Sequence, residues 1–373
     1  MKILHVCKVY LPSKGGVQAV VDWLKNGLNE FGADSAIYTT YSEIDQISTD
    51  KYPDVKRFKS WIEILNMPIS PGLVMALRND VKRYDIVCIH YPFPLADVAI
   101  AISRLRTAKL VVYWHSEIVS QAKTSKLTSV FTEIVLKRAS KIICSSPKLI
   151  EHSNLISKFK EKCVVIPFGI PNSLTPELLE SCLPSKSTRL VFVGRHVPYK
   201  GIDVLIRAFK IICSNDKFDK YSLTLVGNGP LIHHHESLIK SLNLSKRIEI
   251  LKNVENVELR QTLTKARCLV LPSRLPSEAF ALVQLEAMAL GRPVINTNLN
   301  SGVPWVARDG REAITVKPED IDGLATAIAK LCMDDELVDR LGESAKLRHD
   351  DVFAYDKFCS DTYEVYQEIC SKQ

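Results

Sequence analysis

The feature that most constrains this chain is an alternation of short apolar runs with helix-like segments, which stops once and then begins again. Such alternation is typical of parallel strands joined by helices, and brief β-rich runs are typical of strands buried on both faces. The sequence therefore predicts an α/β fold. The predicted strands are Lys2–Val9, Ser35–Tyr41, Ile86–His90, Leu110–Trp114, Lys141–Ser145, Cys163–Pro167, Leu190–Val193, Ser222–Val226, Ile248–Leu251, Cys268–Leu271 and Val294–Asn296.

The interruption lies at residues 171–187, which hold three prolines and several Ser and Thr residues with weak periodicity. We interpret this segment as a linker between a domain of residues 1–170 and a domain of residues 188–355. Residues 356–373 form a last amphipathic helix with apolar side chains available for docking. Two such domains predict a cleft between them, with ligands beyond the carboxyl ends of the strands.

Charge is unevenly distributed. Residues 1–186 carry 24 Lys and Arg against 17 Asp and Glu, whereas residues 187–373 carry 25 of each class. The basic first half indicates an anionic partner there, with chance surface charge as the alternative. The ten cysteines form no Cys-x-x-Cys pair, there is no secretory signal, and no apolar run is long enough to span a bilayer. We expect a cytoplasmic protein with buried thiols.

The segment Gly194–Gly201 directly follows a predicted strand and brings Arg195 and Lys200 into one loop. A pyrophosphate requires paired positive charge, and the guanidinium donors of arginine fit phosphate oxygens. The segment predicts a diphosphate site, with an ordinary charged surface loop as the alternative.

A second segment, residues 278–286, begins and ends with a glutamate. Because Pro272, Ser273 and Pro276 precede Glu278, a helix is predicted to begin near Ala279 or Phe280, with Glu278 at its mouth and Glu286 two turns inside. Eight helical residues span about 12 Å, which suits two carboxylates that hold a donor sugar and a ribose. The free N–H groups of the first turn are candidates to bind sugar or phosphate oxygens.

Two weaker signals occur in other loops. Gly15 and Gly16 separate a strand from a helix and permit close approach to a phosphate, but no Walker A loop follows. His115 ends a strand, where it is a candidate to bind the donor sugar or move a proton; a structural histidine is the alternative. The tract at 233–235 is interpreted as a solvated helix end, and no Asp-x-Asp pair ends a predicted strand, so no metal or other cofactor is predicted.

Together, these segments and Gly227-Asn228-Gly229-Pro230 resemble the retaining family 4 glycosyltransferases of the GT-B fold, in the right order over essentially the whole chain. The resemblance implies two Rossmann-like domains, an N-terminal one for the acceptor and a C-terminal one for a nucleotide-sugar, with the last helix crossing back onto the N-terminal domain. It implies retention of anomeric configuration by front-face attack, with the leaving phosphate taking the acceptor proton.

The resemblance also implies residue roles. Arg195 and Lys200 hold the diphosphate, and Glu286 binds the ribose. Glu278 and the backbone N–H groups of residues 280–282 hold the donor sugar, which His115 contacts. The catalytic residues are thus Glu278, His115, Arg195 and Lys200, and the remaining substrate-binding residues are Gly15, Gly16, Asn228, Phe280, Ala281, Leu282 and Glu286.

One departure concerns Ala279 and Ala281, where family members commonly carry glycine; the added methyl groups place the identity of the sugar in doubt. Residues 300–310 and 197–203 resemble the mannosyl- and rhamnosyltransferase branch that builds bacterial O-antigen and other surface polysaccharides. That resemblance implies GDP-mannose as donor and a polyprenyl-linked glycan as acceptor. The alternatives are a UDP-sugar donor, a GT-B epimerase for which Glu117 is the one suggestive carboxylate, and a non-catalytic nucleotide-sugar-binding protein.

Peripheral membrane contact is a further expectation. Residues 56–62 mix cations with aromatic and aliphatic side chains, as segments at an anionic bilayer surface do. A second amphipathic stretch is flanked by basic residues, and a core-facing helix is the alternative for it. No nucleic-acid module is recognisable in the basic half. The flanking residues are Lys123, Lys126, Lys137, Arg138 and Lys141.

Overall fold

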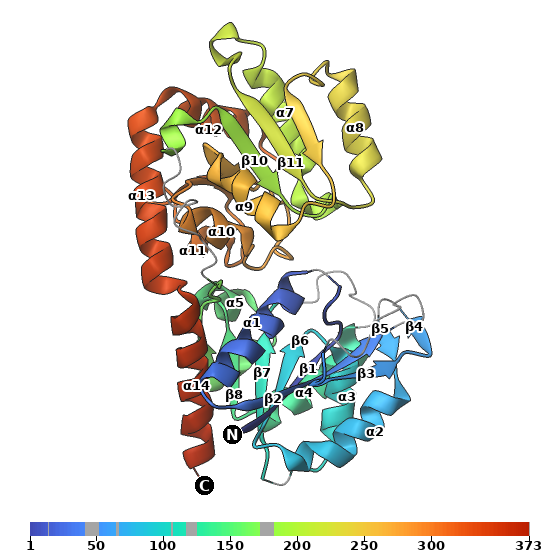
Figure 1. Cartoon of the computed structure of the whole chain (residues 1–373). Coiled ribbons are helices and arrows are strands. Elements are labelled where there is room, and N and C mark those ends of the chain that lie inside the picture. Colours follow the sequence, from blue (N-terminus) through green and yellow to red (C-terminus); the bar gives the residue numbers. More distant parts are fainter. Residues whose placement is uncertain are drawn as a thin grey trace. The chain divides into compact units, whose positions relative to one another are not determined.

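The computed structural model describes residues 1–13, 15–41, 52–64, 67–105, 107–116, 125–171 and 183–372, without the side chains of residues 125–128. The chain forms two compact units, one of residues 1–171 with 355–373 and one of residues 172–354. Both are built on parallel sheets, which confirms the predicted α/β class (Figure 1). The functional roles assigned to the two domains stay predictions.

The first unit contains a seven-stranded parallel sheet in the order β3-β2-β1-β6-β7-β8-β9. Its apolar central strands are buried on both faces; all six residues of β6 are buried, for example. The strands are β1 (Lys2–Cys7), β2 (Asp34–Tyr41), β3 (Val55–Lys59), β6 (Ile86–Tyr91), β7 (Lys109–Trp114), β8 (Lys141–Cys144) and β9 (Cys163–Val165), and a separate antiparallel hairpin contains β4 (Ile62–Ile64) and β5 (Met67–Ile69).

Helices connect these strands and cover the sheet. They are α1 (Gly16–Glu30), α2 (Pro71–Asp80), η2 (Val81–Arg83), α3 (Pro94–Ile102), α4 (Ser125–Arg138), α5 (Pro147–His152), η3 (Ile156–Lys162) and α14 (Tyr355–Ser371).

The last helix, α14, packs beside α1, as Figure 1 shows. Phe358, Tyr366 and Ile369 of α14 are buried, and the Phe358 ring packs against Tyr113 and Phe168. At Gly27 of α1 an added Cβ would lie 2.2 Å from the Cys359 sulfur, so a larger residue would push the two helices apart. The amphipathic pattern of the last helix thus reflects packing onto the first unit.

The second unit contains a six-stranded parallel sheet in the order β12-β11-β10-β13-β14-β15. Helices α7 and α12 lie side by side against the sheet and supply much of the core. The strands are β10 (Arg189–Val193), β11 (Ser222–Val226), β12 (Ile248–Leu251), β13 (Cys268–Val270), β14 (Val294–Thr297) and β15 (Ala313–Val316). The helices are η4 (Pro184–Lys186), η5 (Pro198–Lys200), α7 (Ile202–Ile212), η6 (Asp216–Phe218), α8 (Ile232–Ser241), α9 (Asn256–Thr264), α10 (Val283–Ala289), α11 (Val303–Val306), α12 (Ile321–Met333) and α13 (Asp335–Val352).

Strand order reverses once in each sheet, between β1 and β6 in the first unit and between β10 and β13 in the second. In open α/β sheets a crevice forms at such a reversal, beyond the carboxyl ends of the strands. In the second unit the segments that leave this point follow β10 and β13, and they contain the two segments predicted to bind the donor.

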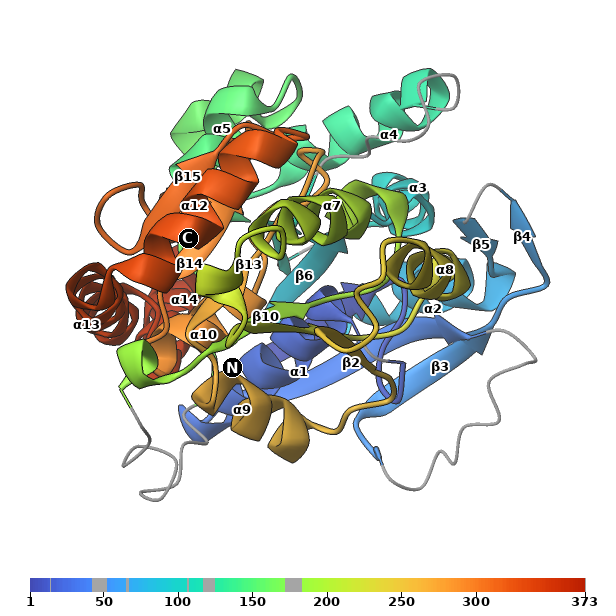
Figure 2. The same cartoon turned by 90° about the horizontal axis from the view of Figure 1, so that it is seen from above.

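Two features of the first unit were not predicted. The basic segment 56–62 contains most of β3, an edge strand, and the start of the β4–β5 hairpin (Figure 2). Arg138 donates hydrogen bonds to the carbonyls of Ile100, Ala101 and Ser103 at the end of α3, so its charge serves a helix terminus. Lys123 lies outside the described residues, as does the side chain of Lys126.

Within the described ranges, no helix is both long enough and apolar enough to cross a bilayer. The nine cysteines that the structure describes carry free thiols, six of them buried. Cys182 lies outside the described residues.

Candidate functional site

The loop after β10 brings Lys200 back over the end of its own strand. The Gly194 N–H donates to the Val226 carbonyl at 2.9 Å, and η5 then turns the chain. Gly201 follows with a φ of 66°, and an added Cβ would lie 2.1 Å from the Pro272 carbonyl oxygen. Glycine is therefore required where this loop meets the segment after β13.

Lys200 and Glu278 form an ion pair at this junction. The Lys200 Nζ lies 2.5 Å from Glu278 Oε2, which also accepts a hydrogen bond of 3.0 Å from the Ser273 hydroxyl. All three side chains are buried. Buried charges require partners, so each of the two ions holds the other in place. The structure brings together these two predicted site residues, and Ser273 is a partner that the sequence analysis missed.

Arg274 fastens the two segments to each other. Its backbone N–H donates to the Tyr199 carbonyl at 2.8 Å, and its guanidinium lies 2.5 Å from Asp203 Oδ2. It also pairs with Glu319 at 3.2 Å. These contacts fix the loop that contains Lys200 relative to the segment that contains Glu278. We refer to the Arg274–Asp203 ion pair as the brace. Sequence reasoning missed it because nothing in the sequence marks these two charged residues as a contact between the two segments.

The predicted helix after Glu278 begins later than expected. Helix α10 starts at Val283, and Ala281 adopts the left-handed region with a φ of 60°. The prediction that a helix begins near Ala279 or Phe280 is wrong, because a left-handed residue cannot continue a right-handed helix. Glu286 consequently lies in the first turn of α10, not two turns inside, and the helical spacing of about 12 Å does not apply.

The backbone between Glu278 and α10 nevertheless presents donors. The Ala281 and Leu282 N–H groups have no hydrogen-bond acceptor among the residues that the structure describes. The Phe280 ring is buried against Trp305 and Phe353, with ring centroids 6.5 and 6.0 Å away. The buried Phe280 ring thus fixes a short segment of backbone whose Ala281 and Leu282 N–H groups are available to an oxygen-rich ligand.

Glu286 is half-buried on a helix whose other residues are mostly buried. Desolvation raises the pKa of this carboxyl, an effect that the charge of Arg260 opposes. Its carboxylate has no hydrogen-bond partner in the described part of the chain. A desolvated acceptor of this kind is suited to hydroxyl donors from a ligand.

The two remaining predicted residues of this unit are exposed. The Arg195 side chain has no ion-pair partner among the described residues, so its guanidinium is available to an anion. The Asn228 side chain donates from Nδ2 to Asn253 Oδ1 at 2.5 Å. The backbone carbonyl of Asn228 accepts from the His196 backbone N–H at 2.8 Å. The second bond joins the loops after β10 and β11.

In the first unit, Gly15 and Gly16 are exposed where α1 begins, and the Gly15 carbonyl accepts from the Ala19 N–H. His115 directly follows β7 and is buried, with its ring stacked on Phe168. Glu117 lies outside the described residues.

His115 is the end of a chain of three buried imidazoles. His90 Nδ1 lies 2.9 Å from His115 Nε2, and His90 Nε2 lies 3.0 Å from His5 Nδ1. Desolvation lowers the pKa of His5 and of His115 to about 3, and burial lowers that of His90 well below its ordinary value. Sequence reasoning missed His5 and His90, although a polar residue inside an apolar strand signals a need for partners.

Two groupings bear on metal binding. The ligand atoms of His5, Cys88 and His90 lie within 4.8 Å of one another. However, His90 Nε2 is already hydrogen-bonded to His5, and burial raises the pKa of the Cys88 thiol to about 12, which disfavours a thiolate. In the tract at 233–235, His235 is buried and lies 2.8 Å from His196 between Nδ1 atoms, so the interpretation of the whole tract as solvated is wrong.

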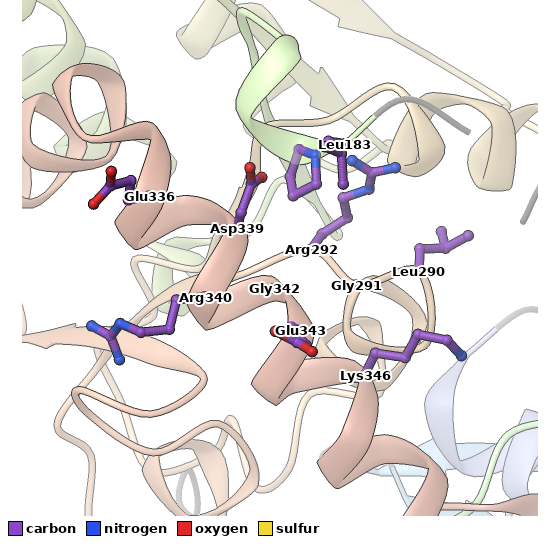
Figure 3. Close-up of a pocket in the computed structure, with 11 residues that line it drawn as sticks. Leu183, Leu290, Gly291, Arg292, Glu336, Asp339, Arg340, Gly342, Glu343 and Lys346 are labelled. Carbon is purple, nitrogen blue, oxygen red and sulfur yellow. The ribbon is translucent and has the colours of Figure 1, made fainter. Parts of the chain in front are cut away.

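A cavity of about 610 Å³ lies elsewhere in the second unit, between α13, η4 and the turn after α10 (Figure 3). Three acidic and three basic side chains line it: Glu336, Asp339, Glu343, Arg292, Arg340 and Lys346. The cavity contains none of the predicted site residues, and its balanced charge does not match a diphosphate.

Comparison with known proteins gives two family matches. Residues 14–173 match the family described as Glycosyltransferase Family 4, and residues 180–348 match the family described as Glycosyl transferases group 1.

Relatives and solved structures match over almost the full length. The chain is 28% identical to O-antigen chain mannosyltransferase C of Escherichia coli, over 99% of each chain. It is 24% identical to the D-rhamnosyltransferase WbpZ of Pseudomonas aeruginosa, over 95% of this chain and 92% of that protein. The crystal structure of Anabaena HepE in complex with UDP superposes with a TM-score of 0.80 at 18% identity, over 99% and 100% of the two chains.

Proposed function

The chain belongs to the glycosyltransferases of the GT-B fold that these two families describe, and on that premise we propose that it transfers mannose from GDP-mannose to a lipid-linked oligosaccharide with retention of configuration. The observation that carries the proposal is the buried Lys200–Glu278 pair at the reversal of strand order in the second unit. It brings a cation and an anion to the point where an α/β sheet binds its ligand.

Each predicted residue has a definite task in this proposal. Lys200 and the exposed Arg195 bind the diphosphate and neutralise the charge that develops as it leaves. Because two cations supply this charge, we propose that the reaction requires no metal. Glu278 and the N–H groups of Ala281 and Leu282 hold the sugar hydroxyls, and the desolvated Glu286 carboxylate accepts from the ribose.

Retention follows in this proposal from attack on the face that the diphosphate leaves. The departing phosphate oxygen takes the proton of the acceptor hydroxyl while the new glycosidic bond forms and the bond to the diphosphate breaks. Lys200 and Arg195 lower the energy of this step by binding the phosphate charge. His115 is proposed to contact the sugar from the first unit.

The choice of donor and acceptor rests on the relatives. One is named as an O-antigen mannosyltransferase and the other as a D-rhamnosyltransferase, which supports transfer of mannose or a related hexose in O-antigen synthesis. The GDP carrier is proposed from the resemblance of residues 197–203 and 300–310 to that branch. HepE was solved with UDP, so a UDP-sugar is the second candidate.

A thermal-shift screen with GDP-mannose, UDP-glucose and UDP-GlcNAc, each with and without EDTA, tests donor binding. A donor at one hundred times its Kd raises the melting temperature of a protein of this size by about 3 °C. We expect the largest shift with GDP-mannose and no effect of EDTA. No shift with any nucleotide would contradict the proposal, and a shift abolished by EDTA would contradict metal independence.

We further propose that the β4–β5 hairpin contacts an anionic membrane surface on the cytoplasmic side, where a polyprenyl-linked acceptor is held. Trp61, Ile62 and Ile64 are 76%, 57% and 49% exposed, and Lys56 and Lys59 on the preceding strand are also exposed. Exposed apolar side chains beside cations favour the interface of an anionic bilayer. Arg57 is not part of this surface, because its guanidinium donates to the Leu11 carbonyl at 2.6 Å.

Sedimentation with anionic and with neutral vesicles tests this surface. Trp61→Ser combined with Ile62→Ser should abolish binding to anionic vesicles. Val257→Ser, a change at a 65% exposed position in the second unit, should leave binding unchanged. Equal sedimentation of the double variant and the wild type would exclude the hairpin.

A further inference from the structure

Three imidazoles connect the interior of the first unit to His115. His5, His90 and His115 come from β1, from β6 and from the residue after β7, and their rings are stacked with centroids 5.3 and 5.2 Å apart. The nitrogen atoms that face one another lie 3.0 and 2.9 Å apart, which is hydrogen-bond distance. All three side chains are at most 4% exposed.

A neutral imidazole carries one N–H and one lone pair, so the chain has two possible proton arrangements. In the first, each ring donates from Nδ1 towards His115, and His115 carries its own proton on Nδ1. In the second, each ring donates from Nε2 towards His5, and the Nδ1 of His115 is a bare acceptor.

The buried end of the chain distinguishes the two arrangements. His5 Nε2 has no hydrogen-bond partner among the described residues. The first arrangement leaves a lone pair there, whereas the second leaves a buried N–H without an acceptor. Orphaned buried N–H groups are the rarer of the two defects, so the first arrangement is favoured.

We propose that His90 and His5 are positioning residues that fix the proton of His115 on Nδ1, so that this nitrogen donates a hydrogen bond to a hydroxyl oxygen of the donor sugar. Nδ1 is the ring nitrogen of His115 for which the described part of the chain supplies no partner. The sugar contact rests on the proposed function, whereas the position of the proton rests on the chain of imidazoles. A fixed donor discriminates between hydroxyl oxygens by geometry without carrying a charge.

The test is ¹⁵N NMR of the full-length protein with labelled histidine rings. His115, one of nine histidines, is assigned by the signals that His115→Gln removes. We expect a protonated Nδ1 and an unprotonated Nε2 in the wild type. His90→Phe removes the donor to Nε2 and should shift the His115 proton towards Nε2, with a loss in kcat/KM of about tenfold. His90→Gln supplies an amide N–H and should recover most of both readouts.

Tyr113→Phe is the matched control. Tyr113 stacks on both His90 and His115, with ring centroids 5.7 and 5.2 Å away, but its hydroxyl is not part of the chain. This variant should change neither the His115 signals nor the turnover.

Once His115 is assigned, the wild-type spectrum tests the position of the proton even when His90→Phe does not fold. A His115 proton on Nε2, or an unchanged His115 in folded His90→Phe, would overturn the proposal. One equivalent of a metal ion in the purified protein, lost in Cys88→Ala, would also overturn it, because the ion would replace the bond between His5 and His90. If the protein transfers no sugar but His115 carries its proton on Nδ1, the proposed function fails and the proton assignment stands.

Discussion

The ammonium group of Lys200 and the carboxylate of Glu278 lie 2.5 Å apart, although the residues are far apart in the sequence. The pair joins the segment after β10 to the segment after β13. A donor that places its diphosphate on Lys200 and its sugar on Glu278 must therefore share or replace an existing buried ion pair. This requirement makes the pair the most informative place to test the account.

Removal of one partner should cost stability as well as activity. Lys200→Met leaves the Glu278 carboxylate buried with the Ser273 hydroxyl as its partner, and we expect a loss of about 1–3 kcal/mol in the free energy of unfolding. Transfer should fall by at least about 100-fold, because positive charge at the leaving group is lost. Chemical denaturation and initial rates measure the two effects.

The double variant Lys200→Met with Glu278→Gln is the control. It removes both charges, so it should regain most of the stability and none of the activity. Recovery of transfer in the double variant would show that the pair is structural.

The Arg274–Asp203 brace should affect donor affinity more than overall stability. Arg274→Ala frees the loop that contains Lys200, and we expect the donor Kd to rise by about tenfold in calorimetric titrations. Arg247→Ala is the comparison, because Arg247 pairs with Asp219 at 3.1 Å in the same unit but outside the donor segments. Equal effects of both variants on donor affinity would rule out a specific role for the brace.

Stability should depend on pH through Glu286. Burial raises the pKa of this carboxyl, so its contribution to stability is full below the unfolded pKa of about 4.3 and is lost as the pH rises through the folded pKa. Glu286→Gln should consequently raise the melting temperature at pH 8 and leave it unchanged at pH 4. The same variant should weaken nucleotide binding. A melting temperature of Glu286→Gln below that of the wild type at pH 8 would contradict the predicted direction of the effect.

Ala281 should tolerate glycine better than Ala279 does. With a φ of 60°, Ala281 occupies a region that costs a non-glycine residue about 1 kcal/mol, so Ala281→Gly should stabilise the protein by that amount. Ala279, which lacks a positive φ, should lose up to about 1 kcal/mol on the same change. Urea denaturation of the two single variants measures both changes in the free energy of unfolding. If Ala281→Gly does not stabilise the protein, the backbone strain inferred at Ala281 is refuted.

Much of the fold follows from local pattern. Strands Ser222–Val226 and Ile248–Leu251 have the predicted bounds, because their apolar runs are short and sharply delimited. The edge strand β3 was missed because its three cations and one aromatic residue also match an interfacial segment. The sequence shows which side chains are apolar, but it does not show which part of the fold packs against them.

The site was predictable where one segment supplies the chemistry and unpredictable where distant segments meet. Lys200 and Glu278 were identified from their loops, but Ser273 and Arg274 act through contacts that depend on how those loops pack. The late start of α10 was missed because the left-handed backbone of Ala281 is imposed by tertiary packing on an alanine that favours helices. The imidazole chain depends on strand order, since β1 and β6 are neighbours in the sheet but not in the sequence.

The most direct test of the central claim is transfer of labelled hexose from GDP-mannose to a polyprenyl-linked glycan in the presence of EDTA, with the anomeric configuration of the product read by NMR. We predict that label enters the lipid fraction with retained configuration in the wild type and in Arg247→Ala, and that it fails to do so in folded Lys200→Met. An absence of transfer from GDP-mannose and from every UDP-sugar tested, or undiminished transfer by Lys200→Met, would contradict the account.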